Sequence, residues 1–406
     1  MPEKLWTKNY TLALAVAFLI SMVFYMLMTT MVLYATEEFG AGDVLAGLAS
    51  SIFVIGAVAA RLVAGPATDR LGRRRVLLVA LVLGTIAALA YFPADGLVAL
   101  LVVRLVHGIA FGAAHTAASA IVQTLIPPAR RAEGTGYHGA TTTLGTAVGP
   151  LVAVLLTADS GYDAVFVVTA TVSVIALGAG VWLRAPKSST PVPVVGGRRR
   201  LVEAAAVPIA SFIFICATAF SGVVAFVSAY ATDLGLTTAA AVFFLVYAVV
   251  VIVTRPFLGR LQDARGDNIV IYPAILCFAA GLGTLAVTQT SAVLLIAAGL
   301  LGLGWGSLMS AGQAVAVRRA PIVSVGLTIS TYFLLVDLGM GFGPIVLGVV
   351  VGQLDYRWMY ATLAVVMLAS CLYYRAVHGK RLGHADQVPA AVPAANPAVG
   401  APTSRE

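Results

Sequence analysis

Long runs of apolar residues, separated by short polar segments, recur along the whole chain. Many approach twenty residues, the length that an α-helix needs to cross the hydrocarbon core of a bilayer. The first run follows Lys4 and Lys8, but it is too long for a signal peptide and no cleavage site follows it. The pattern predicts an all-α membrane protein of twelve transmembrane helices, at about 12–34, 44–64, 76–93, 97–120, 135–157, 163–183, 206–230, 237–258, 269–288, 291–316, 323–351 and 356–377.

The chain contains two copies of one unit. Arg61 recurs 194 positions later as Arg255, and the same offset relates further residues without a gap. The offset also relates these pairs: Gly65 and Gly259, Asp69 and Asp263, Gly72 and Gly266, Gly108 and Gly302, Gly112 and Gly306, Gly145 and Gly339, Gly149 and Gly343, Pro150 and Pro344, and Tyr162 and Tyr356. Duplicated membrane units that share a central site are a common architecture of solute transporters. We therefore expect two pseudo-symmetric six-helix halves, 1–183 and 206–380.

Two segments fall outside the hydrophobic pattern. Residues 184–205 contain several prolines and the run Arg198 to Arg200, which predicts a cytoplasmic linker whose basic residues lie near anionic lipid. Residues 381–406 are rich in alanine and proline and show no periodicity, so we expect a disordered cytoplasmic tail.

Composition agrees with the membrane assignment. Hydrophobic residues make up 60% of the chain and charged residues 10%, against about 45–50% and about 25% in soluble domains. If both termini are cytoplasmic, nearly all Lys and Arg residues fall on the inner side of the membrane. The exceptions are Arg104, which lies inside a helix, and Arg357, which lies on the outer side. This bias accounts for the net charge of +8 without nucleic-acid binding. Arginine far outnumbers lysine, and alanine and glycine are abundant, which suggests a GC-rich bacterial genome. We therefore expect a multi-pass protein of a bacterial inner membrane.

The loop from Gly65 to Arg75 reads G-P-A-T-D-R-L-G-R-R-R, and its glycines permit close approach and a tight turn. It resembles the signature loop of the major facilitator superfamily, with a weaker copy from Gly259 to Asp267. The resemblance spans about residues 6–380 and implies a latch that holds the halves shut on the inside, with Asp69 and Arg73 as a charge relay. The latch candidates are Gly65, Asp69, Arg70, Gly72, Arg73 and Asp263. The alternative is a loop that only sets topology.

The fourth span contains Arg104, a residue type that is costly inside a membrane and usually faces a cavity or a partner. At 100° per residue, His107 and His115 share one helix face with it. In proton antiporters of similar sequence the arginine at this position takes part in proton coupling, so the resemblance implies that role for Arg104. The alternatives are an arginine bonded to backbone carbonyls and histidines that serve packing.

The fifth span contains Gly145, Gly149 and Pro150. Small residues four apart let helices approach closely, and proline disturbs a helix locally. The segment resembles the antiporter motif of twelve-helix drug:proton exporters, although Ala153 replaces the last glycine of that motif. Helix packing without any influence on transport direction is the alternative.

Asp337 is the one carboxylate that the predicted spans place near the middle of the membrane. On its helix it lies away from Gly339 and Gly343, so a packing seam formed by these glycines would turn it toward a water-filled cavity. Such a carboxylate can bind and release a proton, which makes Asp337 a candidate for coupling. A static buried ion pair is the alternative.

Polar and aromatic residues of the other spans predict a cavity for amphiphilic, partly aromatic molecules. The candidates are Tyr25, Thr29, Tyr247, Trp305, Ser310 and Gln313. Trp305 lies in a glycine-rich helix and fits a packing role equally well.

These features together favour a secondary transporter that exports small amphiphilic compounds or drugs in exchange for protons. Export of a sugar, siderophore or other metabolite is the rival. A membrane-embedded enzyme is disfavoured, since the chain has no P-loop, HExxH or Gly-x-Ser-x-Gly motif, and a channel fits the duplicated halves poorly.

We expect a monomer whose partners are protons, membrane lipids and a small-molecule substrate. Cys216, Cys277 and Cys371 lie in different spans, so we expect no disulfide, metal or cofactor.

Overall fold

The computed structural model describes residues 4–41, 43–185, 201–321 and 324–379. Helices make up nearly all of these ranges, and no strand occurs in them, so the all-α prediction is confirmed. The elements in chain order are α1 (Lys8–Phe39), α2 (Asp43–Leu71), α3 (Arg73–Leu89), α4 (Leu97–Leu125), η1 (Pro128–Arg130), α5 (Arg131–Trp182), α6 (Val207–Asp233), α7 (Thr237–Arg265), α8 (Asn268–Ala286), α9 (Ser291–Arg319), α10 (Val325–Leu354) and α11 (Tyr356–Val377).

The predicted fifth and sixth spans are joined directly within α5. Two apolar segments long enough to cross a membrane, Pro128–Thr157 and Ser160–Trp182, meet at Gly161. Gly161 has φ 75° and ψ −173°, a conformation that reverses the chain in one residue and that glycine adopts readily. Counted in this way, the described ranges contain 11 segments long and apolar enough to cross a membrane, and α3, with 17 residues, takes the place of the remaining predicted span.

The sequence repeat is also a repeat of helix boundaries. Both ends of α2 shifted by 194 positions give both ends of α7, and α4 and α9 are related in the same way. The counterpart of Gly161 is Asp355, which has φ 101° and ψ 173° and whose side chain caps α11 by accepting from the Trp358 amide. The two halves are therefore copies of one helical unit.

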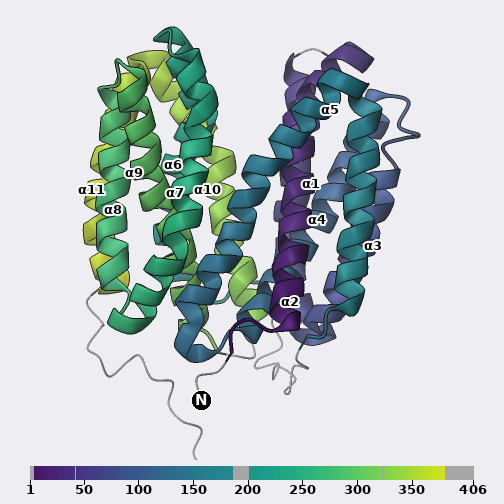
Figure 1. Cartoon of the computed structure of the whole chain (residues 1–406), viewed down its shortest axis with the longest axis horizontal. Helices are drawn as coiled ribbons and strands as arrows, with labels where there is room; N and C mark the ends of the chain where they lie inside the picture. The colour runs from purple at the N-terminus through teal and green to yellow at the C-terminus, as the bar shows by residue number, and fades with distance from the viewer. Residues whose placement is uncertain (1–3, 42, 186–200, 322–323, 380–406) are drawn as a thin grey trace, which may run out of the picture.

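The halves form two bundles that stand side by side, α1 to α5 in one and α6 to α11 in the other (Figure 1). Two clusters of buried apolar side chains lie within the first bundle, and a third lies almost entirely within the second. Each half thus has its own core.

Glycines set the close crossings inside each half. A Cβ atom at Gly108 or Gly112 of α4 would clash with the α2 backbone at Phe53 or Ala57. Their counterparts Gly302 and Gly306 pack closely against α7, at the Tyr247 carbonyl and the Val251 side chain. Close backbone approach of this kind is the usual basis of helix association in membranes.

The two ends of the molecule differ in charge. We call basic the end that carries exposed Arg70, Arg74, Arg75 and Arg265, and acidic the end that carries exposed Glu37, Asp95, Asp163 and Asp355. The start of α1 lies at the basic end, where Asn9 accepts from the Arg184 amide and Arg74 donates to the Leu183 carbonyl. Most of the predicted linker and the whole predicted tail lie outside the described residues.

One sequence expectation is wrong. Arg61 and Arg255 do not lie at the inner surface, because α2 and α7 continue to Leu71 and Arg265, beyond the predicted span ends. Ten residues separate each arginine from its helix end, a distance of about 15 Å along a helix. Both guanidinium groups are therefore inside the bundle.

Candidate functional site at the interface of the two halves

Asp69 of α2 joins the two halves at the basic end. Its carboxylate accepts hydrogen bonds from the backbone amides of Gly326 (2.9 Å) and Leu327 (2.8 Å), at the first turn of α10. Amides in a first helical turn lack partners within the helix and carry the positive end of the helix dipole. Asp69 therefore caps a helix of the other half. A Cβ at Gly326 would clash with Thr68, so glycine is needed at this crossing.

Asp263 of α7 makes the reciprocal contact. It accepts from the amides of Ala132 (2.8 Å) and Glu133 (2.9 Å), at the first turn of α5. Ala132 and Glu133 shifted by 194 positions are Gly326 and Leu327. The structure thus has two equivalent contacts between the halves, each an aspartate of one half on a helix N-terminus of the other, and we refer to them as the Asp69 latch and the Asp263 latch after the predicted role. The sequence prediction assigned Asp263 to the weaker copy, but its contact is as short as that of Asp69.

Charged residues surround both latches. Arg73 lies 4.0 Å from Asp69, and Gly72 has the positive φ (95°) that its predicted turn requires. Arg70 is exposed. On the other side, Glu133 binds Arg130 of its own half at 2.6 Å and Arg260 of the opposite half at 2.8 Å.

A second group of charges lies behind the Asp263 latch, at the turn between α7 and α8. Arg318 bridges Asp263 (3.6 Å) and Asp267. Asp267 also accepts from Gln262 (2.7 Å) and pairs with His378 (2.9 Å), just after α11. Burial opposes the charged form of Asp267, but the hydrogen bond from His378, the Arg318 charge and the Gln262 amide outweigh it and lower the pKa to about 2.

Near the middle of the bundle, Arg61 of α2 pairs with Asp337 of α10. Arg61 Nε donates to Asp337 Oδ2 at 2.6 Å, and the guanidinium also reaches Thr116 Oγ1 at 3.5 Å. The Arg61 side chain is 3% exposed and that of Asp337 19%. The sequence predicted that Asp337 points toward a water-filled cavity. In the structure it pairs with a cation of the other half, and part of its side chain keeps access to solvent.

Aromatic and imidazole groups extend this pair across the interface. Arg61 lies over the Phe333 ring at 5.1 Å, and His115 meets the same ring edge to face at 4.7 Å. His115 is followed by His138 at 6.3 Å between ring centres, and His138 shares a hydrogen bond with Ser119 at 2.9 Å. We call Arg61, Asp337, Phe333, His115 and His138, together with Arg255, the central layer.

Arg255 reaches the central layer from α7. Its Nε donates to the Gly306 carbonyl at 3.3 Å, and its guanidinium lies against Gly139 of α5, where a Cβ atom would clash with Nη1. The side chain is buried. Within the described ranges Nη1 has no hydrogen-bond partner, and no carboxylate pairs with Arg255.

The structure does not bring Arg104 to Asp337. Arg104 Nε donates to the Ala49 carbonyl at 2.8 Å and its guanidinium lies over Phe53 at 4.6 Å, both on α2 of the same half. His107 also packs against Phe53 and shares a hydrogen bond with Tyr91 (3.3 Å). This geometry corresponds to the structural alternative for Arg104 and His107. Among the predicted coupling residues, only His115 joins Asp337 in the central layer.

The glycines of the predicted antiporter motif pack inside the first half. Cβ atoms at Gly145 and Gly149 of α5 would press on α1 at Ser21 and Met22, and Pro150 lies within α5 directly after them. Gly339 and Gly343 pack α10 on α6 in the same way. The motif therefore sets the close packing of α5 on α1.

Two of the predicted cavity residues meet in the second half. Phe220 of α6 stacks on Trp305 (5.1 Å, 20°) and on Tyr247 (5.4 Å, 28°), forming one aromatic stack. Tyr25 of α1 lies within electrostatic reach of Tyr247 and Asp337. Thr29 is exposed. Ser310 and Gln313 are buried on α9, and Ser310 lines a space of about 10 Å³ beside Arg255.

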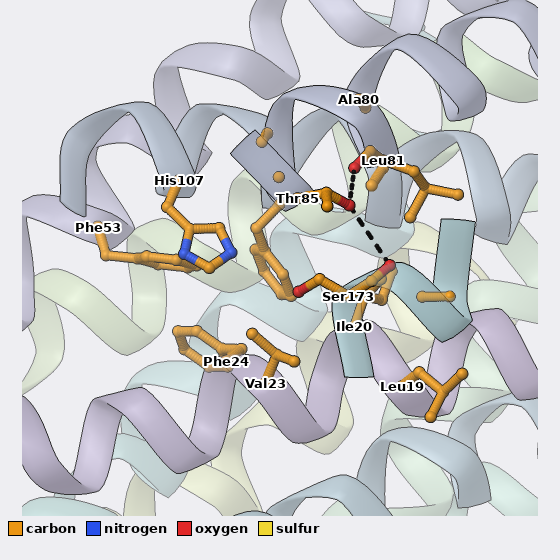
Figure 2. A pocket seen from close by; sticks show the side chains of 15 residues that line it. Leu19, Ile20, Val23, Phe24, Phe53, Ala80, Leu81, Thr85, His107 and Ser173 are labelled. Carbon is orange, nitrogen blue, oxygen red and sulfur yellow. Dashed lines mark hydrogen bonds between the residues drawn. The ribbon is translucent and has the colours of Figure 1, made fainter. Parts of the chain in front are cut away.

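A larger cavity of about 30 Å³ lies elsewhere, inside the first half (Figure 2). Its labelled walls are mostly apolar, with His107 on one side and Thr85 on another, and Thr85 Oγ1 donates to the carbonyls of Leu81 (2.8 Å) and Ser173 (3.4 Å). This volume suits one or two waters and not a solute. The candidate solute path is therefore the interface between the halves.

Sequence reasoning missed Arg61, Arg255, Phe333 and Phe220. The two arginines were visible as a repeated pair, but their charge was assigned to the inner surface with the neighbouring loop. An arginine that recurs in both halves inside a predicted span was the available signal. Among the described residues, no group of three or more His, Cys, Asp or Glu side chains is placed to hold a metal.

Comparison with known proteins gives a consistent assignment. An uncharacterized transporter of Burkholderia pseudomallei (strain 1106a), described as of major-facilitator type, is 27% identical over 359 residues, which cover 84% of this chain and 86% of the relative. A Mycobacterium tuberculosis protein described as a probable nitrate/nitrite transporter is 29% identical over 364 residues, covering 82% and 86%.

Solved structures of low identity share the fold. A human organic anion transporter matches with a TM-score of 0.74 at 16% identity, over 90% of this chain and 98% of that one. The proton:xylose symporter XylE, bound to a bromodeoxyglucose, matches with 0.75 at 16%, over 90% and 94%. The family pattern described as Major Facilitator Superfamily matches residues 13–321 and 244–400. The chain therefore belongs to the major facilitator superfamily, a family of membrane transporters rather than enzymes.

Proposed function

We propose that the protein is a proton-coupled secondary transporter that exports small amphiphilic compounds by alternating access. The observation that carries the proposal is the Arg61–Asp337 pair, a 2.6 Å contact between the two halves with some access to solvent. Only a charged Asp337 binds Arg61 strongly, so a proton that reaches the carboxylate weakens a contact between the halves. A group with this property links protonation to the arrangement of the halves.

The latches describe one end state of the cycle. With the basic end at the cytoplasm, Asp69 and Asp263 hold the halves together on the inside. Each carboxylate on a helix N-terminus contributes about 1–2 kcal/mol. Protonation or substrate binding can supply free energies of that size, since each tenfold preference for one state is worth about 1.4 kcal/mol. Opening of the basic end then requires both latches to break together with the Arg61–Asp337 pair.

The aromatic stack favours an amphiphilic substrate. Trp305, Phe220 and Tyr247 form a stack that is buried in the closed arrangement, and Tyr247 reaches toward Arg255 of the central layer; separation of the halves would have to uncover the stack for a solute to contact it. A molecule with an apolar ring and a polar group can contact both. The antiporter-like segment around Gly149 supports the export direction in this proposal.

A second candidate is transport of a small polar metabolite. The relative described as a nitrate/nitrite transporter favours it, because by that description it carries a small inorganic ion. Amphiphilic dyes and small polar solutes, tested side by side in one vesicle assay, separate the candidates.

The test of coupling uses everted inner-membrane vesicles and three dyes of different charge: ethidium, rhodamine and fluorescein. We expect the wild-type protein to drive uphill accumulation of at least one dye when the vesicle interior is acidified. Asp337→Asn should abolish uphill accumulation, since an amide does not titrate, and retain downhill exchange. Asp163→Asn, at an exposed aspartate of the acidic end, is the matched control. Uphill accumulation at the wild-type rate in Asp337→Asn would refute the coupling role.

A further inference from the structure

Arg255 is a buried cation that no carboxylate of the described residues pairs with. Its side chain is 5% exposed, Nε is bound only to a backbone carbonyl, and Nη1 has no hydrogen-bond partner in the described part of the chain. Burying a guanidinium without a counter-charge costs several kcal/mol. A protein that keeps such a group at the interface of two moving halves has a use for it in another step of its cycle.

The repeat shows which interaction Arg255 lacks. Arg61, its counterpart, binds the carboxylate of Asp337 in the other half. The residue that corresponds to Asp337 in the first half is Thr143 on α5. Thr143 is buried and donates to the carbonyl of Gly139 (3.2 Å), the residue against which Arg255 lies. Arg61 therefore pairs with an aspartate across the interface, whereas the residue equivalent to that aspartate in the half opposite Arg255 carries only a hydroxyl.

The central layer has an excess of positive charge as a result. Arg61, Arg255 and Asp337 sum to one positive charge when His115 and His138 are neutral. The other groups within electrostatic reach of Arg255 are the His138 ring and the hydroxyls of Tyr247 and Tyr332, none of which is a carboxylate. Tyr247 also belongs to the aromatic stack with Phe220. Apolar surface and an uncompensated guanidinium therefore lie side by side.

We propose that Arg255 binds an anionic group of the transported solute, a carboxylate or a comparable oxyanion, opposite α5 where the repeat has Thr143 in place of an aspartate. The aromatic stack of Trp305, Phe220 and Tyr247 receives the apolar part of the same molecule. The substrate class is then an aromatic or aliphatic organic acid. This inference rests on the proposed function and narrows its substrate.

The first test is direct binding to the purified full-length protein in detergent. Acetate, benzoate, decanoate and citrate are compared with benzamide and benzylamine by calorimetry and thermal shift. We expect at least one carboxylate to bind and to raise the melting temperature, benzamide to bind about tenfold more weakly than benzoate, and benzylamine not to bind. Arg255→Gln should weaken carboxylate binding by about tenfold or more. Arg375→Gln, at an exposed position near the end of α11, is the control and should bind as wild type.

The second test supplies the missing carboxylate from the protein itself. Thr143→Asp places a carboxylate at the position equivalent to Asp337, where it should pair with Arg255. We expect this variant to melt at a higher temperature than wild type and to lose carboxylate binding, while Thr143→Asn, of equal size and no charge, does neither. The gain in melting temperature should vanish when Thr143→Asp is combined with Arg255→Gln.

The outcomes are distinct. Failure of every carboxylate to bind, stronger binding of benzylamine than of benzoate, or unchanged benzoate binding in Arg255→Gln would overturn the inference. The inference would also be overturned if Thr143→Asp lowered the melting temperature by the same amount in the wild-type background and in the Arg255→Gln background. Binding does not require proton coupling, so carboxylate binding through Arg255 in a protein whose Asp337→Asn variant still transports uphill would retain the anion site and refute the proposed coupling.

Discussion

At the scale of single residues, buried charge decides which positions matter. Membrane interiors penalise ions, so each buried ion needs a partner or a function. Asp337 has Arg61, and Asp267 has Arg318 and His378. Arg104 has a backbone carbonyl and the face of Phe53. Among the described residues Arg255 has a single hydrogen-bond partner, the Gly306 carbonyl at Nε, which is why it carries the substrate inference.

Asp267 gives a prediction on pH. Its folded-state pKa, about 2, is below the ordinary value of 3.8. A depressed carboxylate pKa contributes stability that is complete above the unfolded value and disappears as the pH falls through the folded one. We expect Asp267→Asn to lower the free energy of unfolding by roughly 2 kcal/mol at pH 6 and to melt like wild type near pH 2. Melting curves in detergent at a series of pH values measure the difference.

Asp163→Asn serves as the comparison for Asp267, because Asp163 is an exposed aspartate at the opposite end of the molecule. It should melt within about 1 °C of wild type over the whole range, since exposed charges contribute little. A gap between Asp267→Asn and wild type that stays constant from pH 6 to pH 2 would show that the aspartate contributes through its shape and not its charge.

Residue roles were harder to predict than residue types. The sequence identified Asp337 because a carboxylate inside an apolar run stands out. It could not identify Arg61 as the partner, because that contact joins α2 to α10, 276 positions apart, and depends on how the halves dock. Arg104 and Asp337 were both candidates for coupling, but the structure places Arg104 against α2 of its own half.

At the scale of helices, small residues decide how closely the elements pack. Gly108 on α4 and Gly178 on α5 are both helical glycines, but a Cβ at Gly108 would enter the Phe53 carbonyl of α2, and a Cβ at Gly178 meets nothing within 4 Å. We expect Gly108→Ala to lower the melting temperature in detergent by several degrees, because α2 and α4 must separate. Gly178→Ala should be neutral or slightly stabilising, since alanine favours helix. Equal effects of the two changes would contradict the packing role.

Helix number and order followed from the sequence because apolar runs of membrane length are a strong signal. Helix ends did not, since α2 and α7 extend past their apolar runs into the basic end. The direct joining of two spans at Gly161 was also not predicted, because only the positive φ of that glycine reveals a reversal within one residue. Asp355 takes the same conformation in the second half at the cost of backbone strain, which its cap on α11 offsets.

At the scale of the whole molecule, the repeat makes the closed interface nearly symmetric. Asp69 binds α10 and Asp263 binds α5 at matched residues. Symmetric latches let both sides open together, as rocking of two rigid halves requires. One departure from this symmetry is informative. Thr143 occupies in the first half the position that Asp337 occupies in the second, so the two sides of the central layer differ in charge.

The reciprocal latches give the last prediction. If each contributes about 1–2 kcal/mol to closure of the basic end, Asp69→Asn or Asp263→Asn alone should shift the ratio of open to closed molecules about tenfold, and the double variant about a hundredfold. Spin labels at Arg75→Cys and Arg265→Cys, in a chain from which Cys216, Cys277 and Cys371 have been removed, report the separation of the two halves by electron–electron resonance. We expect a longer distance to gain population in each single variant to a similar extent and to dominate in the double variant, while expression and membrane insertion stay unchanged. A double variant that keeps the wild-type distance distribution would show that closure depends on the Arg61–Asp337 pair and helix packing, with the two aspartates serving only to cap their helices.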